Sequence, residues 1–149
     1  MPKKPKNKQP LAHFAVNLFE SGVPTRNGRI YDAETISRIG NQINTTPTVI
    51  EEVSPIERSI KNIPISEVWL DHAMAISTGA TMQDGKLLVE FDVLPNRYGK
   101  LLMSTIESVG GIENMNFAPV GCGDVDSNGV VKGYTYSYVS FNVTNREPS

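Results

Sequence analysis

Apolar side chains at every second position predict several β-strands in this chain. The first strand begins at Phe14, which shares one face with Val16 and Leu18. Further strands are expected at residues 48–53, 65–76, 87–93, 115–119 and 134–143. The Asp84-Gly85 pair predicts a tight hairpin turn, because both residue types tolerate the backbone angles that such turns need.

The last predicted strand contains a change of phase. Tyr134, Tyr136 and Tyr138 alternate on one face, and the apolar positions then shift to Val139 and Phe141. An extra residue in one strand of a pair produces such a shift, so we expect a β-bulge near Tyr138. We expect the three tyrosines to pack in the core or at a protein interface rather than to stack on nucleic-acid bases.

Two segments have the apolar spacing of amphipathic helices. Asp32 and Asn96 are predicted N-caps, because short polar side chains accept hydrogen bonds from the first free backbone N–H groups of a helix. Gly110 is predicted to end the second helix, and residues 54–64 are predicted to form an exposed loop. The apolar stripes consist of Ile36, Ile39 and Ile43 in the first helix and Leu102, Ile106 and Val109 in the second. These elements predict an α+β fold, a mostly antiparallel β-barrel with two helices.

Composition limits the classes of function. With 149 residues, 39% of them hydrophobic, the chain is long enough for one domain with a core. Its net charge of -2 makes nucleic acid an unlikely partner, because duplex binding needs a clustered basic face. The single Cys122 excludes an internal disulfide and suits assembly in a cytoplasm. We expect no membrane span, metal site or cofactor, since long apolar stretches and paired His or Cys residues are lacking.

The first ten residues form a separate basic segment. Its lysines, interleaved with three prolines, are Lys3, Lys4, Lys6 and Lys8. Because proline cannot continue a helix, we expect an extended arm over residues 1–10 and one domain over residues 11–149. The arm is either a solubilising tail or a contact with an acidic partner.

Four short motifs occur in a distinctive order. They are Arg26-Asn27-Gly28-Arg29-Ile30-Tyr31, Leu94-Pro95-Asn96-Arg97-Tyr98-Gly99-Lys100, Gly121-Cys122-Gly123 and the closing segment 142–149. In this order they resemble the prohead proteases of tailed bacteriophages, which are related to herpesvirus assembly proteases. The resemblance implies that protease fold from Phe14 onward. We predict a structural role for the first motif, with Asn27-Gly28 in a turn and Tyr31 packed under the first helix.

The resemblance fails at the positions of the catalytic residues. The family has a nucleophilic Ser at a late strand and a His at the end of an earlier one. Alignment on Gly121 places Ala118 at the nucleophile, whereas alignment from the second helix places Asn116 there. In Glu51-Glu52-Val53-Ser54-Pro55, Ser54 stands where the family has His. Neither an acyl-enzyme nor an imidazole base is therefore predicted at these positions.

His72 is the weak alternative for a catalytic base, through the segment Leu70-Asp71-His72-Ala73. Adjacent residues of a strand point to opposite faces, so Asp71 is poorly placed to orient His72. We therefore predict a structural or surface role for His72 and a surface position for His13. An active protease would need Ser54 or Ser104 as nucleophile with His72.

Glu51 and Glu52 are adjacent carboxylates that could be a catalytic acid and base. Neighbours on a strand diverge, so we predict that the pair lies on a solvated edge of the sheet.

The resemblance and the lost catalytic residues together predict a bacteriophage head protein. We expect a catalytically inactive, protease-like domain that binds the major capsid protein lattice as a decoration or cement protein and self-associates on the capsid. Lys3, Lys4, Lys6 and Lys8 are the expected capsid contacts. The expected location is the virion, after assembly in the host cytoplasm. The alternatives are an active prohead serine protease and an internal scaffold component.

Overall fold

The computed structural model describes residues 9–25, 28–52, 59–63 and 72–142. These residues form one six-stranded sheet with the strand order β1-β4-β3-β2-β6-β5. The strands are β1 (Ala12–Glu20), β2 (Val49–Glu52), β3 (Ala73–Gln83), β4 (Lys86–Val93), β5 (Asn116–Val125) and β6 (Val131–Asn142). The helices are α1 (Ala33–Thr45), α3 (Arg97–Val109) and the short 3₁₀ turn η2 (Ile112–Asn114). A further helical turn at residues 59–61 lies within the segment predicted as a loop.

The sheet is mixed and curled rather than a closed antiparallel barrel. The pairing of β2 with β6 is parallel, while the other four pairings are antiparallel. The edge strands β1 and β5 approach each other through the rings of Phe14 and Phe117, whose centroids are 5.6 Å apart. The prediction of an α+β fold is confirmed, and that of a mostly antiparallel barrel is only partly met. The predicted strand at 65–76 is described only from Ala73, and it continues past Gly79 to Gln83.

Helix ends follow the predicted capping residues. The Asp32 side chain accepts a hydrogen bond from Thr35 N at 2.8 Å, and Asn96 Oδ1 accepts one from Gly99 N at 2.7 Å. Gly110 ends α3 with φ of 92°, a left-handed angle that costs least for glycine. Both helices therefore begin where local sequence chemistry predicts.

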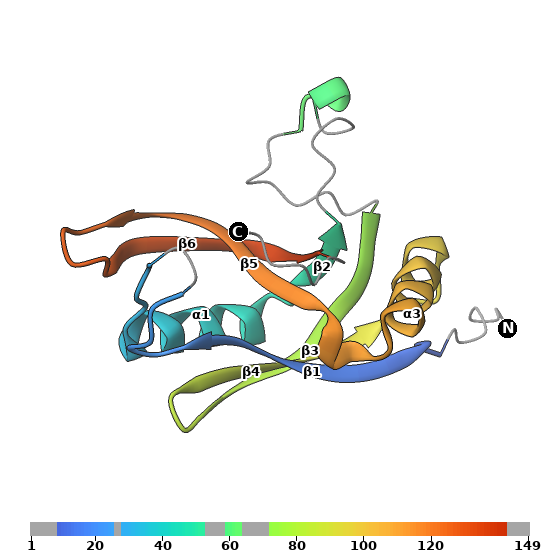
Figure 1. Cartoon of the computed structure of the whole chain (residues 1–149), viewed down its shortest axis with the longest axis horizontal. Helices are drawn as coiled ribbons and strands as arrows, with labels where there is room; N and C mark the ends of the chain where they lie inside the picture. Colours follow the sequence, from blue (N-terminus) through green and yellow to red (C-terminus); the bar gives the residue numbers. More distant parts are fainter. Residues whose placement is uncertain (1–8, 26–27, 53–58, 64–71, 143–149) are drawn as a thin grey trace, which may run out of the picture.

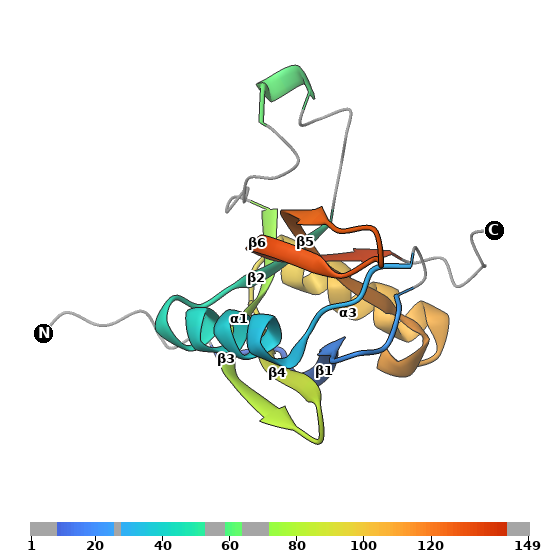
Figure 2. The ribbon, with the colours of Figure 1, turned by 90° about the vertical axis from the view of Figure 1, so that its left-hand side faces the viewer.

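The helices pack on the curled sheet at separate places. Figures 1 and 2 show α1 between the β3–β4 hairpin and the β5–β6 hairpin, with α3 farther along the long axis. Both predicted apolar stripes contribute to the main core, which also contains residues of β3, β4 and β6. No helix in the described ranges is both long and apolar enough to cross a membrane.

The predicted bulge lies in β6 next to Tyr138. Tyr138 pairs with Val120 and Tyr136 with Gly121, which leaves Ser137 as the extra residue. Because the phase changes at Ser137 and not after Tyr138, the three tyrosines do not share one face. Tyr134 and Tyr136 belong to the main core, whereas Tyr138 packs in a small second cluster with Val49 and Ala73.

Candidate functional site

The motif around Gly28 attaches its segment to the turn between β5 and β6. Ile30 N donates a hydrogen bond to Gly129 O at 2.7 Å, and Val131 N donates one to Ile30 O at 2.8 Å. Gly28 has φ of 81° and its N–H donates to Thr25 O at 2.8 Å, which agrees with the predicted turn. Arg26 and Asn27 lie outside the described residues, and Arg29 is exposed. The described part of this motif therefore has a structural role, because it links the segment before α1 to the β5–β6 turn.

Tyr31 is buried, as predicted, with 6% of its surface exposed. Its ring makes edge contacts with Phe19 of β1 and Tyr134 of β6, at centroid distances of 4.9 and 5.3 Å. Burial, with a smaller effect from Tyr31, raises the pKa of Tyr134 above its ordinary value. The tyrosine of the motif thus joins the first strand to the last one.

The Gly-x-Gly motif of β5 makes room for Tyr134. A Cβ atom on Gly121 would lie 2.5 Å from the hydroxyl oxygen of Tyr134, and one on Gly123 would lie 3.0 Å from Tyr134 Cα. Real Cβ contacts are longer than the first of these, so a side chain at Gly121 would displace the ring. These glycines therefore have a packing role that is independent of catalysis.

The position aligned with the family nucleophile lies in a row across three strands. Ala118 of β5 is directly opposite Ser140 of β6, and Ser140 is opposite Glu51 of β2. Residues directly opposite each other share a face of the sheet, so these three project to the same side. Ser140 Oγ donates to Ala118 O at 3.4 Å. The alternative position, Asn116, is opposite Asn142.

Glu51 is fully buried, which corrects the prediction of a solvated edge. The prediction was wrong because β2 lies between β3 and β6 in the interior of the sheet. A buried carboxylate is costly and is retained where it is well partnered or used. Ser54 lies three residues beyond Glu51, outside the described residues. Glu51 is thus the site residue that sequence patterns assigned to the wrong environment.

His72 contacts the first turn of α3. Its Nε2 lies 3.3 Å from Tyr98 Oη, and the two rings stack with centroids 4.5 Å apart. Arg97 also lies over the Tyr98 ring, with its Cζ 5.1 Å from the ring centroid. Ser104 is six residues beyond Tyr98, about 9 Å along the helix at ~1.5 Å per residue. The structure therefore joins His72 to α3 without bringing Ser104 to it.

His13 lies on the surface, as predicted, between two carboxylates of β4. Its Nδ1 is 2.6 Å from Asp92 Oδ1 and its Nε2 is 2.9 Å from Glu90 Oε1. The hydrogen bond to Asp92, followed by that to Glu90, raises the pKa of His13. Within the described ranges, no three His, Cys, Asp or Glu side chains gather closely enough to hold a metal ion.

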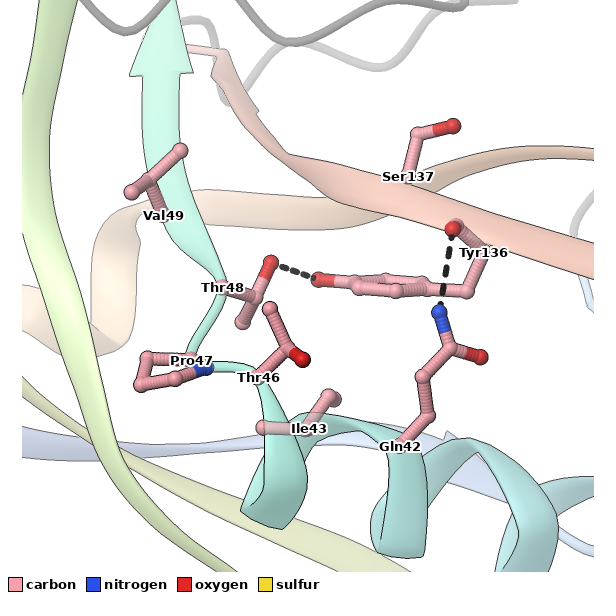
Figure 3. A pocket seen from close by; sticks show the side chains of 8 residues that line it. All are labelled: Gln42, Ile43, Thr46, Pro47, Thr48, Val49, Tyr136 and Ser137. Atoms are coloured by element: carbon pink, nitrogen blue, oxygen red, sulfur yellow. Dashed lines mark hydrogen bonds between the residues drawn. The ribbon is translucent and has the colours of Figure 1, made fainter.

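A pocket of about 330 Å³ opens between the end of α1 and β6. Figure 3 shows the Tyr136 hydroxyl directed at Thr48, with an oxygen-to-oxygen distance of 2.7 Å, and the Gln42 amide directed at Tyr136 O. Burial raises the pKa of Tyr136 still further above neutral pH, where a tyrosine hydroxyl is protonated in any case. None of the described residues that line this pocket is charged, so they provide neither an acid–base pair nor a set of metal ligands.

Comparison with solved structures identifies a similar fold. The structure of the bacteriophage T4 capsid assembly protease, gp21, matches with a TM-score of 0.70 over 87% of this chain and 79% of that chain. The fold is similar to that of a capsid assembly protease. Sequence identity in the match is 18%, so the likeness extends to architecture alone. No protein-family model and no curated protein sequence matches the chain.

The similarity confirms the protease-like fold expected from the order of the motifs. It does not test the roles expected of individual residues. Lys3, Lys4, Lys6 and Lys8 lie outside the described residues, as does most of the closing segment 142–149. Their predicted contacts remain predictions.

Proposed function

We propose that this chain is a bacteriophage head protein that has the fold of a capsid assembly protease and acts by binding rather than by hydrolysis. The observation that carries the proposal is Ala118, the residue that alignment on Gly121 matches to the family nucleophile, which lies in one row with Ser140 and Glu51. A similar fold serves as a capsid assembly protease in bacteriophage T4, which supports a role in the head.

The chemistry of the row supports a loss of hydrolysis. A methyl group at Ala118 has no atom that can attack a carbonyl, and the amide of Asn116 cannot form an acyl-enzyme. A serine nucleophile also needs a base within hydrogen-bond reach. His72 is stacked on Tyr98 at the start of α3, and β2 separates its strand from β6.

The proposed activity is attachment to the major capsid protein as a decoration or cement protein. The basic arm would extend over a neighbouring subunit and become ordered on assembly. Each such link adds avidity to the shell without high individual affinity. The domain would be located in the mature virion after assembly in the host cytoplasm.

Two measurements test this proposal. Purified protein incubated with its cognate major capsid protein should leave that protein intact, as checked by mass spectrometry of the products. A cryo-EM map of the mature particle should contain the domain on the outer capsid surface. Density on the inner surface would instead support a scaffold, and absence from mature particles would contradict the proposal.

A second candidate is an active prohead protease, and the row in the sheet favours it in one respect. Ser140 carries a hydroxyl on the last strand, directly opposite the buried Glu51 of β2. Specific processing of the capsid protein that disappears in Ser140→Ala, Ser54→Ala or His72→Ala would establish this alternative. Processing that persists in these three variants and in Ser104→Ala would indicate a contaminating protease.

A further inference from the structure

The pocket between the end of α1 and β6 contains a pair of hydroxyls that leaves one hydrogen without an acceptor. Tyr136 Oη and Thr48 Oγ1 are 2.7 Å apart (Figure 3), and each residue is only 6% exposed. Each hydroxyl carries one hydrogen, and the hydrogen bond between them uses one of the two. No other group of the described residues accepts a hydrogen bond from either hydroxyl. A buried donor without an acceptor is costly, so the second hydrogen calls for an acceptor that enters the pocket.

Neighbouring hydrogen bonds hold this pair in place. Thr48 N donates to Ser77 Oγ at 2.8 Å, and Ser77 N donates to Thr48 O at 2.8 Å. The Gln42 amide donates to Tyr136 O at 3.5 Å on the exposed side of the pocket. Ser137, the extra residue of the bulge in β6, also lines the pocket, and bulges often redirect side chains beside functional sites. The donor is therefore fixed in position before any ligand binds.

The walls of the pocket favour an uncharged ligand. Ile43, Pro47 and Val49 supply apolar surface, and none of the described lining residues is charged. A charged ligand would lose its hydration there without gaining an ion pair. The volume of about 330 Å³ is far larger than the ~30 Å³ that one water molecule occupies in the liquid. It lies at the lower end of the range of roughly 300–1,000 Å³ that is typical of pockets for small molecules.

We propose that this pocket binds a small neutral molecule with an apolar body and one hydrogen-bond acceptor, such as the carbonyl of a ketone or an amide. The carbonyl oxygen accepts the second hydrogen of the Tyr136–Thr48 pair, and the apolar body displaces water from the wall at Val49. None of the residues in the row of Ala118 lines this pocket. The inference therefore does not depend on whether the chain hydrolyses capsid proteins or binds them.

Three ring compounds of similar size test the chemistry of the ligand. Acetophenone carries a carbonyl acceptor, toluene has the ring without an acceptor, and benzylammonium carries a positive charge at neutral pH. In NMR titrations of the isotopically labelled full chain, acetophenone should give saturable shifts of the backbone amide signals of Thr48 and Ser137. Toluene should bind through the apolar walls alone. Benzylammonium should give no saturable shift there, because the lining residues include no carboxylate.

Removal of both hydroxyls isolates the proposed hydrogen bond. The double variant Tyr136→Phe with Thr48→Val keeps the shape of the pocket and removes both hydroxyl hydrogens. It should bind acetophenone about three- to tenfold more weakly, because a neutral hydrogen bond contributes about this factor, and it should bind toluene at least as tightly as before. Thermal melting should be little changed, since replacing both partners by apolar groups of similar shape costs little stability. Tyr98→Phe with Thr81→Val is the matched control, because both residues lie outside the pocket, and it should leave the affinity for acetophenone unchanged.

The dissociation constants decide between a ligand site and a pocket that holds only water. Weaker binding of acetophenone by the double variant, with the affinity for toluene retained, would support the proposed site. Equal affinity of the unchanged protein and the double variant for acetophenone would refute it. Lack of saturable shifts at Thr48 and Ser137 up to the solubility limit of acetophenone, or equally tight binding of benzylammonium, would also refute it.

Discussion

At the scale of single residues, packing alone explains the glycine at position 121, which belongs to a motif that resembles one of the protease family. Gly121→Ala should destabilise the domain by about 1–3 kcal/mol, because its Cβ would meet the Tyr134 hydroxyl and the backbone oxygen of Thr135. Urea denaturation followed by fluorescence measures the change. Gly79→Ala is the control, since nothing lies within 4 Å of a Cβ there. Equal stability of the two variants would contradict this explanation.

His13 should make the stability of the domain depend on pH. Its hydrogen bonds to Asp92 and Glu90 raise its pKa in the folded state above the ordinary 6.5. The contribution is therefore fully present below pH 6.5, and it is lost as the pH rises through the folded pKa. Comparison of the unchanged protein with His13→Gln in thermal melts should show a difference that shrinks over this window.

The pKa of His13 can also be measured directly. NMR titration should give a value above 6.5, and Asp92→Asn should lower it more than Glu90→Gln does, because the bond to Asp92 is the larger cause. A titration indistinguishable from that of a free imidazole would show that the two hydrogen bonds do not persist in solution.

At the scale of elements, Tyr31 connects strands that are far apart in the sequence. Tyr31→Ala removes its edge contacts with Phe19 and Tyr134, and large aromatic truncations in cores cost about 3–5 kcal/mol. We therefore expect a clearly lower melting temperature. Arg29→Ala, an exposed change in the same motif, should have little effect. If melting were unchanged while capsid binding was lost, Tyr31 would be an interface residue instead.

Elements whose ends depend on local chemistry were predictable from the sequence. Asp32 and Asn96 cap their helices, and Gly110 ends α3, because each acts on backbone groups within a few residues. The sequence predicted that β6 contains a bulge, but it did not predict at which residue the bulge lies. Its position at Ser137 is set by pairing with β5, which a local pattern does not contain.

The candidate site was less predictable than the fold, because its geometry depends on strand order. Nothing local indicates that β2 pairs in parallel with β6, yet this pairing buries Glu51 and places it beside Ser140. Adjacent glutamates in a short strand indicate solvent exposure when the neighbours of the strand are unknown. The contact of Ala118 with Ser140 similarly depends on the register of the last two strands.

At the scale of the whole molecule, the role of the basic arm can be tested. The arm either contacts the capsid or is only a solubilising tail. Deletion of residues 1–9 should leave the domain folded but weaken its attachment to capsids. Raised salt should also weaken the attachment of the full chain to capsids, because exposed charges are screened within ~10 Å at 0.1 M. Sedimentation with expanded capsids measures both effects.

The matched control keeps the length of the arm and changes only its charge. Replacement of Lys3, Lys4, Lys6 and Lys8 by Gln should weaken attachment as much as the deletion does. Full-strength binding that is independent of salt in either variant would remove the arm from the proposed function.

The open edge of the sheet has a mechanical consequence. The chain enters the domain through β1, which is bonded along one side to β4 and meets β5 through Phe14 and Phe117. A pull on the N-terminus along the strand would load the whole β1–β4 ladder at once, in shear. A pull outward would load its hydrogen bonds one after another, beginning with the bond from Leu11 N to Val93 O. If the arm is attached to a shell that moves, the direction of the tension would therefore decide whether the β1–β4 pairing resists the force or opens from its N-terminal end.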